Sequence, residues 1–234
     1  MPSISSNQTG SPVVHVAGPR PTLRQFAREV RDLALSVPLF VTSPLLRHWH
    51  RRWGATDAEV AAALPGDELV PGAHVFCTRA ITIDAPPEAV WPWLVQVGFG
   101  KAGFYSHDVL DNVAHLSADR ILDEFQDADV GDWVPMFSKV NDTTAFKIAA
   151  IKPDEELLWV KPDSTWAWTL TDIGERTRLV TRLRVLYRWH RPGDALISLV
   201  FMELGDFSMM RKMLRTLKQR AEAEPTEPGY RGAK

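Results

Sequence analysis

One carboxylate in the last third of the chain, Glu203, is the residue that the sequence best places to do chemistry. Apolar residues recur at helical spacing through residues 194–223, and Glu203 falls in the middle of the stripe that they form. A carboxylate on that stripe faces the interior, where burial raises its pKa and suits it to act as a general acid or base. An ion pair with an arginine, or a hydrogen bond to a buried hydroxyl, is the structural alternative. Asp206, at the edge of the stripe, is expected to be exposed.

A second candidate site lies at residues 103–112, which read Gly-Phe-Tyr-Ser-His-Asp-Val-Leu-Asp-Asn. Here Tyr105 could donate a proton and His107 could titrate as a base at the mouth of a pocket. The structural alternative is that Ser106 or Asp108 caps a helix and that Tyr105 packs under a sheet.

Metal and phosphate chemistry are not indicated. The spacing of His107, Asp111 and His115 is i, i+4 and i+8, and the first and last are about 12 Å apart along a straight helix, too far to share one ion. Cys77 is the single cysteine, so a zinc cluster of cysteines is excluded. Residues 98–103 are rich in glycine but follow a helix, which is the wrong context for a phosphate loop. We therefore expect no metal and no other cofactor.

The composition is that of an ordinary globular protein. Of 234 residues, 45% are hydrophobic and 24% are charged, which is enough for one sizeable domain with a real core. The formal net charge of −2 gives no field that would attract nucleic acid, so we expect no nucleic-acid partner. A single cysteine suggests a reducing compartment, and we expect a cytoplasmic protein. The nine tryptophans are expected to line a core or a cavity.

Composition also divides the chain into four parts. Residues 1–20 are polar, show no signal-peptide pattern and are expected to be disordered. Residues 21–71 form a helical extension and a connector, residues 72–222 form one domain, and residues 223–234 form a mobile tail.

The extension combines an apolar helix with a basic, tryptophan-containing segment. Its most apolar stretch, residues 33–46, is shorter than the roughly 20 residues of a membrane span and contains two prolines. Arginine and tryptophan are concentrated in residues 47–53. Residues 23–53 could therefore lie in a membrane interface as a peripheral contact. Packing against the main domain or against a partner subunit is the alternative, and the oligomeric state stays open.

The main domain alternates as strands do. After a strand ending at Ile83, Pro86 and Pro87 open a short helix, and a second helix is expected over residues 105–116. The last strand has the clearest pattern: Leu179, Leu183, Val185, Tyr187 and Trp189 share one face and four arginines share the other, which is expected to be solvated. Further strands are expected at Gly131–Phe137, Thr143–Ile151, Leu157–Lys161, Thr165–Thr171 and Thr177–Trp189, before the helix of residues 194–223.

Residues 76–98, Phe-Cys-Thr-Arg-Ala-Ile-Thr-Ile-Asp-Ala-Pro-Pro-Glu-Ala-Val-Trp-Pro-Trp-Leu-Val-Gln-Val-Gly, resemble the first strand and helix of the START-like, or SRPBCC, superfamily. Tyr105, Asp108, Leu110 and Asn112 match a motif of one branch, whereas His107 stands where that branch has an aromatic residue. The resemblance covers about residues 53–222. It implies an α+β helix-grip fold, in which a curved antiparallel sheet wraps a long C-terminal helix around a cavity.

Two functions follow from this resemblance. The first is binding or transport of a hydrophobic small molecule, lipid or polyketide-like, in that cavity. The alternative is a cyclase or dehydratase acting on a polyketide-like substrate, and the sequence leaves open whether the protein is an enzyme. The candidate catalytic residues are Glu203, Tyr105 and His107, and the candidate ligand-binding residues are Trp93, Tyr105, Trp133, Trp159, Trp166, Trp168, Tyr187, Glu203, Phe207 and Met210.

Overall fold

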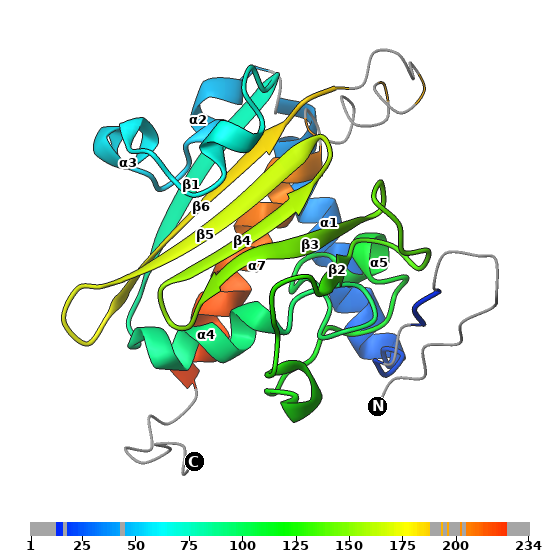
Figure 1. The fold of residues 1–234 in the computed structure, drawn as a ribbon. Helices are drawn as coiled ribbons and strands as arrows, with labels where there is room; N and C mark the ends of the chain where they lie inside the picture. The colour runs from blue at the N-terminus through cyan, green and yellow to red at the C-terminus, as the bar shows by residue number, and fades with distance from the viewer. Residues whose placement is uncertain are drawn as a thin grey trace, which may run out of the picture.

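The computed structural model describes residues 13–15, 18–42, 45–187, 193, 196, 202 and 205–223. Its centre is one six-stranded antiparallel sheet with the order β1-β6-β5-β4-β3-β2, so that β1 is an edge strand (Figure 1). The strands are β1 (Val75–Ile83), β2 (Trp133–Pro135), β3 (Ala145–Lys152), β4 (Glu156–Lys161), β5 (Ser164–Asp172) and β6 (Thr177–Val185). Glu203, Trp189 at the end of the expected last strand, and residues 224–234 of the tail lie outside the described residues.

Helices surround this sheet on both faces. In Figure 1, α7 crosses behind the sheet and the segment that contains α3 lies in front of β1 and β6. The helices are α1 (Leu23–Thr42), α2 (Arg47–Arg51), α3 (Asp57–Ala61), α4 (Pro87–Val95), α5 (Asp108–Asp111) and α7 (Asp206–Ala223), with short 3₁₀ turns at Asp67–Leu69 and Asp123–Phe125. This is the helix-grip arrangement that the resemblance to START-like proteins implies, and the expected α+β class is confirmed.

The hydrophobic core lies between the sheet and α7. The expected apolar stripe is buried in its C-terminal part, where Phe207, Met210, Leu214 and Leu217 face the sheet. Leu196, which the same stripe included, is 58% exposed. From the sheet, alternate residues of β4, β5 and β6 point into this layer because successive side chains of a strand point to opposite faces.

The other face of the sheet is covered by residues 54–71. The expectation that the arginines of β6 face solvent is wrong, because this segment folds over them. Arg182 is 2% exposed and donates hydrogen bonds to the carbonyl oxygens of Glu59, Val60 and Ala62 and to the carboxylate of Asp67. The three carbonyls lie at the end of the short helix α3, so one guanidinium satisfies groups that the helix leaves unpaired.

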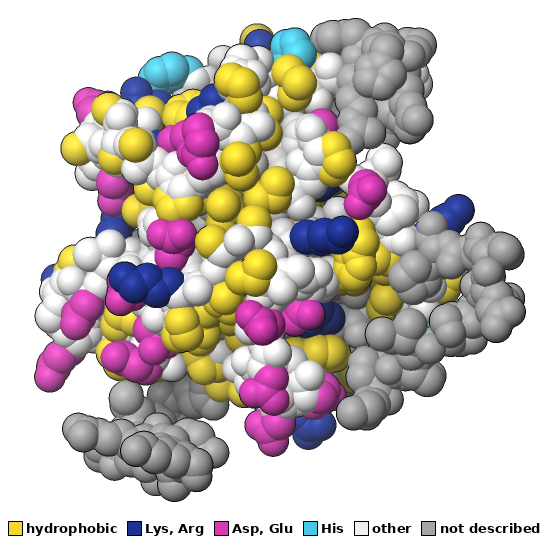
Figure 2. Space-filling view, in the orientation of Figure 1, with side chains coloured by type: hydrophobic (Ala, Val, Ile, Leu, Met, Phe, Trp, Pro, Cys, Tyr) yellow, Lys and Arg dark blue, Asp and Glu magenta, His cyan; other side chains and the backbone are white. Residues whose placement is uncertain are grey.

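Arg178 anchors the start of the same segment. Its guanidinium binds both carboxylate oxygens of Glu59, at 2.7 and 2.8 Å, and this pairing lowers the pKa of Glu59 to about 2. Glu59 also closes a capping box with Thr56. The face of the molecule in Figure 2 interleaves acidic, basic and hydrophobic side chains, so that face carries no broad basic surface for nucleic acid.

Two expected elements are shorter than their patterns suggested. The helix of residues 105–116 is reduced to α5, because Tyr105, Val113 and Ala114 have positive φ angles of 57°, 50° and 57° that a right-handed helix cannot contain. The strand of residues 131–137 keeps only the three residues of β2, which pair with β3.

A buried ion pair joins β1 to α7. Arg79 and Asp206 are 3% and 4% exposed, and the guanidinium donates to the carboxylate at 2.5 Å. Arg79 also donates to the carbonyl oxygen of His50 at 2.8 Å, and the His50 ring stacks on Phe207 at 3.8 Å. The expectation that Asp206 is exposed is therefore wrong: the carboxylate turns from the edge of the stripe into the core to neutralise Arg79.

We predict that Asp206→Asn lowers the free energy of unfolding by about 3–5 kcal/mol, because it leaves the Arg79 guanidinium buried without a countercharge. Chemical denaturation measures this change. Asp127→Asn, at an exposed position, is the control and should change stability by less than about 0.5 kcal/mol. A loss as small as that of the control would show that the ion pair does not hold α7 to β1.

Candidate functional site

An aromatic cluster fills the layer between the sheet and α7. The rings of Trp159, Trp166 and Trp168 lie 5.0–5.6 Å apart, and Phe146 lies 6.0 Å from Trp166. Trp166 donates its indole hydrogen to the hydroxyl of Thr181 at 2.9 Å. These tryptophans pack against each other and form part of the hydrophobic core.

The other expected pocket residues are dispersed around this cluster. Trp93, Tyr187 and Met210 belong to the same core, and Phe207 lies under Trp49, His50 and Trp53. Trp133 is different. It pairs with Lys147, whose ammonium lies 4.4 Å from the centre of its ring, so it faces away from the core residues Val134 and Phe146.

Tyr105 is bound on both sides of its hydroxyl. The oxygen accepts a hydrogen bond from the Gln96 amide at 2.8 Å, and the hydroxyl donates to the carbonyl oxygen of Trp93 at 3.0 Å. The Arg220 guanidinium lies 4.3 Å from the centre of its ring. Burial raises the pKa of Tyr105 above its ordinary value. The Tyr105 hydroxyl thus joins the loop after α4 to α4 itself, and it stays protonated at neutral pH.

His107 faces a different part of α7. Its ring nitrogens lie 3.4 Å from the Ser208 hydroxyl and 3.5 Å from the Lys212 ammonium, whereas Tyr105 contacts Arg220, at least about two helical turns further on. Burial, with the charge of Lys212, lowers the pKa of His107 to about 4, so the ring is neutral at pH 7. Tyr105 and His107 therefore do not converge on one point.

The helix-capping interpretation of residues 106–108 is wrong. The N-cap of α5 is His107, which makes no side-chain cap bond. Asp108 instead accepts hydrogen bonds from the hydroxyl and the backbone N–H of Ser117, at 2.5 and 3.0 Å. The neighbouring carboxylate oxygens of Asp111 are enclosed, and burial together with the charge of Asp108 raises the pKa of Asp111 to about 8. Within the described residues, no three His, Cys, Asp or Glu side chains gather as metal ligands would.

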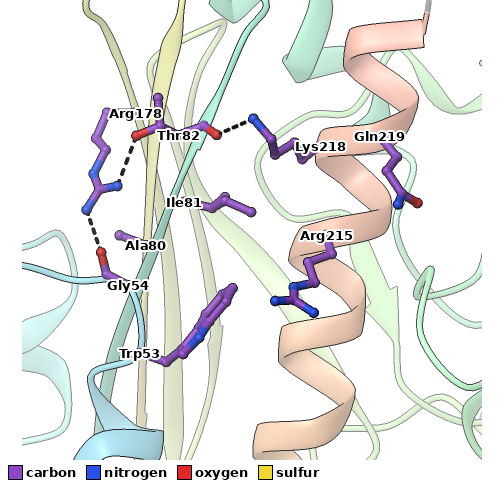
Figure 3. A pocket seen from close by; sticks show the side chains of 9 residues that line it. All are labelled: Trp53, Gly54, Ala80, Ile81, Thr82, Arg178, Arg215, Lys218 and Gln219. Carbon is purple, nitrogen blue, oxygen red and sulfur yellow. Dashed lines mark hydrogen bonds between the residues drawn. The ribbon is translucent and has the colours of Figure 1, made fainter.

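A groove of about 590 Å³ opens where the edge strand β1 faces α7 (Figure 3). Its walls come from four segments that are far apart in the sequence. They are Trp53 and Gly54 after α2, Ala80, Ile81 and Thr82 of β1, Arg178 of β6, and Arg215, Lys218 and Gln219 of α7. None of the residues that the sequence nominated for ligand binding lines this groove.

Glycine at position 54 allows the wall to form. The Ala80 N–H donates to the carbonyl oxygen of Trp53 at 3.1 Å, so the chain runs against the free edge of β1. Gly54 has a φ of +74°, and a Cβ there would lie 2.0 Å from the Ala80 oxygen. Any side chain would push this segment off the strand, and the indole of Trp53 would leave the groove.

The charges of the groove are only partly neutralised. Lys218 donates to the Thr82 carbonyl oxygen and pairs with Asp84 and Glu222, and Arg178 is held by Glu59. Arg215 is exposed, and in the described part of the chain it pairs with no carboxylate. Figure 3 shows it extending from α7 toward Trp53, and its guanidinium carbon lies 5.7 Å from the centre of that ring.

A second arginine stands beside it. The guanidinium carbon of Arg211 lies 5.8 Å from the centre of the Trp53 ring, and its Nε is buried without a hydrogen-bond partner among the described residues. Burial and the charge of Arg215 lower the pKa of Arg211. Two guanidinium groups thus flank one indole, an arrangement that an anion would stabilise.

Sequence reasoning did not identify this groove. Trp53 stood out only as part of a basic, aromatic segment, and no prediction was made for Arg211 or Arg215. Their i, i+4 spacing places them on one face of α7. Nothing in the sequence indicates that Trp53, more than 150 residues earlier, meets that face.

Comparison with protein-family models and with curated proteins finds no match. Solved structures with a similar fold include the polyketide cyclase-like protein Cgl2372 of Corynebacterium glutamicum, 15% identical, with a TM-score of 0.42 over 70% of this chain and 100% of that one. Another is CalC of Micromonospora echinospora, a self-sacrificing resistance protein, at 9% identity and a TM-score of 0.40 over 65% and 97% of the two chains. Similarities this distant identify neither a ligand nor a reaction.

We predict that Asp111→Asn changes how stability depends on pH. The carboxyl titrates near pH 4 when unfolded and at about 8 when folded, so the native protein holds the extra proton between these values. As the pH rises through that window, the free energy of unfolding of the wild type, relative to that of Asp111→Asn, should therefore fall by up to about 1.4 kcal/mol per pH unit. Denaturant unfolding from pH 4 to 8 measures the difference, and Asp142→Asn is the exposed control. A pH-independent difference would mean that Asp111 is ionised in the fold.

Proposed function

We propose that the protein binds a hydrophobic small molecule that carries an acidic group, and that it does so between β1 and α7. The observation that carries this proposal is the groove, whose volume of about 590 Å³ suits a drug-sized ligand. Trp53 and Ile81 offer apolar surface, and Arg215 offers a cation that no described carboxylate neutralises.

The chemistry of the walls supports the acidic group. A carboxylate beside Arg215 would form a charge-assisted hydrogen bond, and it would relieve the repulsion between Arg211 and Arg215. A flat apolar body fits against the indole of Trp53, because aromatic rings stack in offset or edge-on contacts. Lipids and polyketide-like compounds with a free carboxyl both belong to this class.

The positions of Tyr105 and His107, two of the three candidate catalytic residues, favour binding over catalysis, whereas Glu203 lies outside the described residues. The Tyr105 hydroxyl has its donor and acceptor bonds satisfied within the protein, and His107 lies against Ser208 and Lys212. Neither side chain lines the groove. We therefore assign structural roles to Tyr105 and His107, and we propose neither transport of the ligand nor its turnover.

The test is titration of the full chain with 2-naphthoate and with its neutral analogue 2-naphthylmethanol by isothermal calorimetry. We expect Arg215→Gln to weaken naphthoate binding about tenfold or more and to leave naphthylmethanol unchanged, because only the anion uses the guanidinium. Trp53→Leu should weaken both ligands, since both use the ring.

The control is Arg176→Gln, which removes an exposed arginine of the β5–β6 turn that does not line the groove. It should bind both probes as the wild type does. The indole N–H resonance of Trp53 should shift on binding. Wild-type affinity in Arg215→Gln and Trp53→Leu, with shifts at core tryptophans instead, would place the ligand elsewhere.

A further inference from the structure

Helix α1 contacts the domain with a mixed side, on which Leu33, Leu39 and Phe40 are half-buried together with polar residues. Glu29 forms an ion pair with Lys212 of α7 at 3.0 Å, and Asp32 and Ser36 are half-buried on the same side. Phe40 adds a ring contact with His107 at 6.3 Å. No residue of α1 is buried. The helix is thus attached through an ion pair and a few side chains, and it contributes little to the core.

The opposite side of α1 is apolar and faces outward. At 100° per residue, six exposed residues lie within about 40° of Leu23. This outer stripe consists of Leu23, Ala27, Val30, Ala34, Val37 and Val41. Its four larger members are 84%, 44%, 49% and 69% exposed in that order. Beyond the helix, Leu45 and Trp49 are exposed as well. A surface helix normally turns its apolar stripe to the core, so this orientation points to an external partner.

The charges beside the stripe identify that partner. Arg24 and Arg31 lie beside one border of the outer stripe, Arg28 lies further round the helix on the same side, and all three are exposed. Arg31 pairs with the adjacent Asp32, whereas Arg24 and Arg28 have no acidic partner in the part of the chain that the structure describes. Apolar side chains bordered by arginines match a lipid surface with anionic headgroups. A second copy of the chain would place the same positive charges at both sides of the contact.

We propose that α1 docks the protein on an anionic lipid surface, with the outer stripe inserted among the headgroups and the arginines beside phosphates. Twenty residues give a helix about 30 Å long that would lie in the plane of the membrane. None of the described helices is both long and apolar enough to span a bilayer. This inference does not depend on the groove or on its ligand.

Sedimentation of the full chain with vesicles tests it. The wild type should bind vesicles of phosphatidylcholine with 30% phosphatidylglycerol and leave vesicles of pure phosphatidylcholine unbound. Because salt screens the electrostatic attraction between the arginines and the anionic headgroups, binding should weaken as the salt concentration rises from 50 to 500 mM. Val30→Glu with Val37→Glu should abolish binding. Arg24→Gln with Arg28→Gln and Arg31→Gln should weaken it on the order of 100-fold.

Matched controls come from the β5–β6 turn, which lies far from α1 in Figure 1. Ile173→Glu and Arg176→Gln change exposed residues of the same kinds and should bind as the wild type does. Thermal melting confirms that each variant is folded. The proposal is overturned if the wild type ignores anionic vesicles at low salt, or if the Val30 and Val37 variant still binds. It is also overturned if that variant instead abolishes a dimer seen by analytical ultracentrifugation.

Discussion

The buried pair of Arg79 and Asp206 sets how the last helix lies on the sheet. An isolated charge in the core would cost several kcal/mol, so the guanidinium on β1 requires the carboxylate on α7. Five residues further along the chain, just past the end of β1, Asp84 pairs with Lys218 of α7, and its N–H donates to Glu222. Five strand residues and twelve helix residues both span roughly 17–18 Å, so the two ties keep strand and helix in register. The groove lies between these ties, where β1 and α7 are held together without filling the space.

The two faces of the sheet use arginine for different purposes. On the face toward α7, Arg79 neutralises one carboxylate and fixes a helix. On the other face, Arg178 and Arg182 bind backbone carbonyls and carboxylates of residues 54–71 and so attach a segment that has little regular structure of its own. That segment brings Trp53 and Gly54 to the edge of β1. The groove thus depends on contacts made on both faces of the sheet.

Much of the fold could be predicted from the sequence, because alternation and helical spacing report local geometry. The strands β1 and β3 to β6 and the buried stripe of α7 were expected. The sequence patterns could not show what covers each face of the sheet. The alternating arginines of β6 give the same pattern whether they face solvent or bind backbone carbonyls. The helix expected over residues 105–116 is interrupted locally, because Tyr105, Val113 and Ala114 have positive φ angles. Composition does not reveal this, nor the hydrogen bonds of Tyr105 with Ser117 and Gln96.

The candidate catalytic residues that the sequence indicated are not the residues that line the groove, and the difference has a physical reason. Tyr105, His107 and Asp108 are polar groups in a buried loop, and burial obliges each to find a partner within the protein. Once these groups are paired within the protein, their protons and lone pairs are not available to a ligand. Trp53 lies against the edge of β1, and Arg215 is exposed on α7 without a described carboxylate partner, so both can still bind a ligand. The indole and the guanidinium groups come from separate elements, and only the packing of α7 on β1 brings them together.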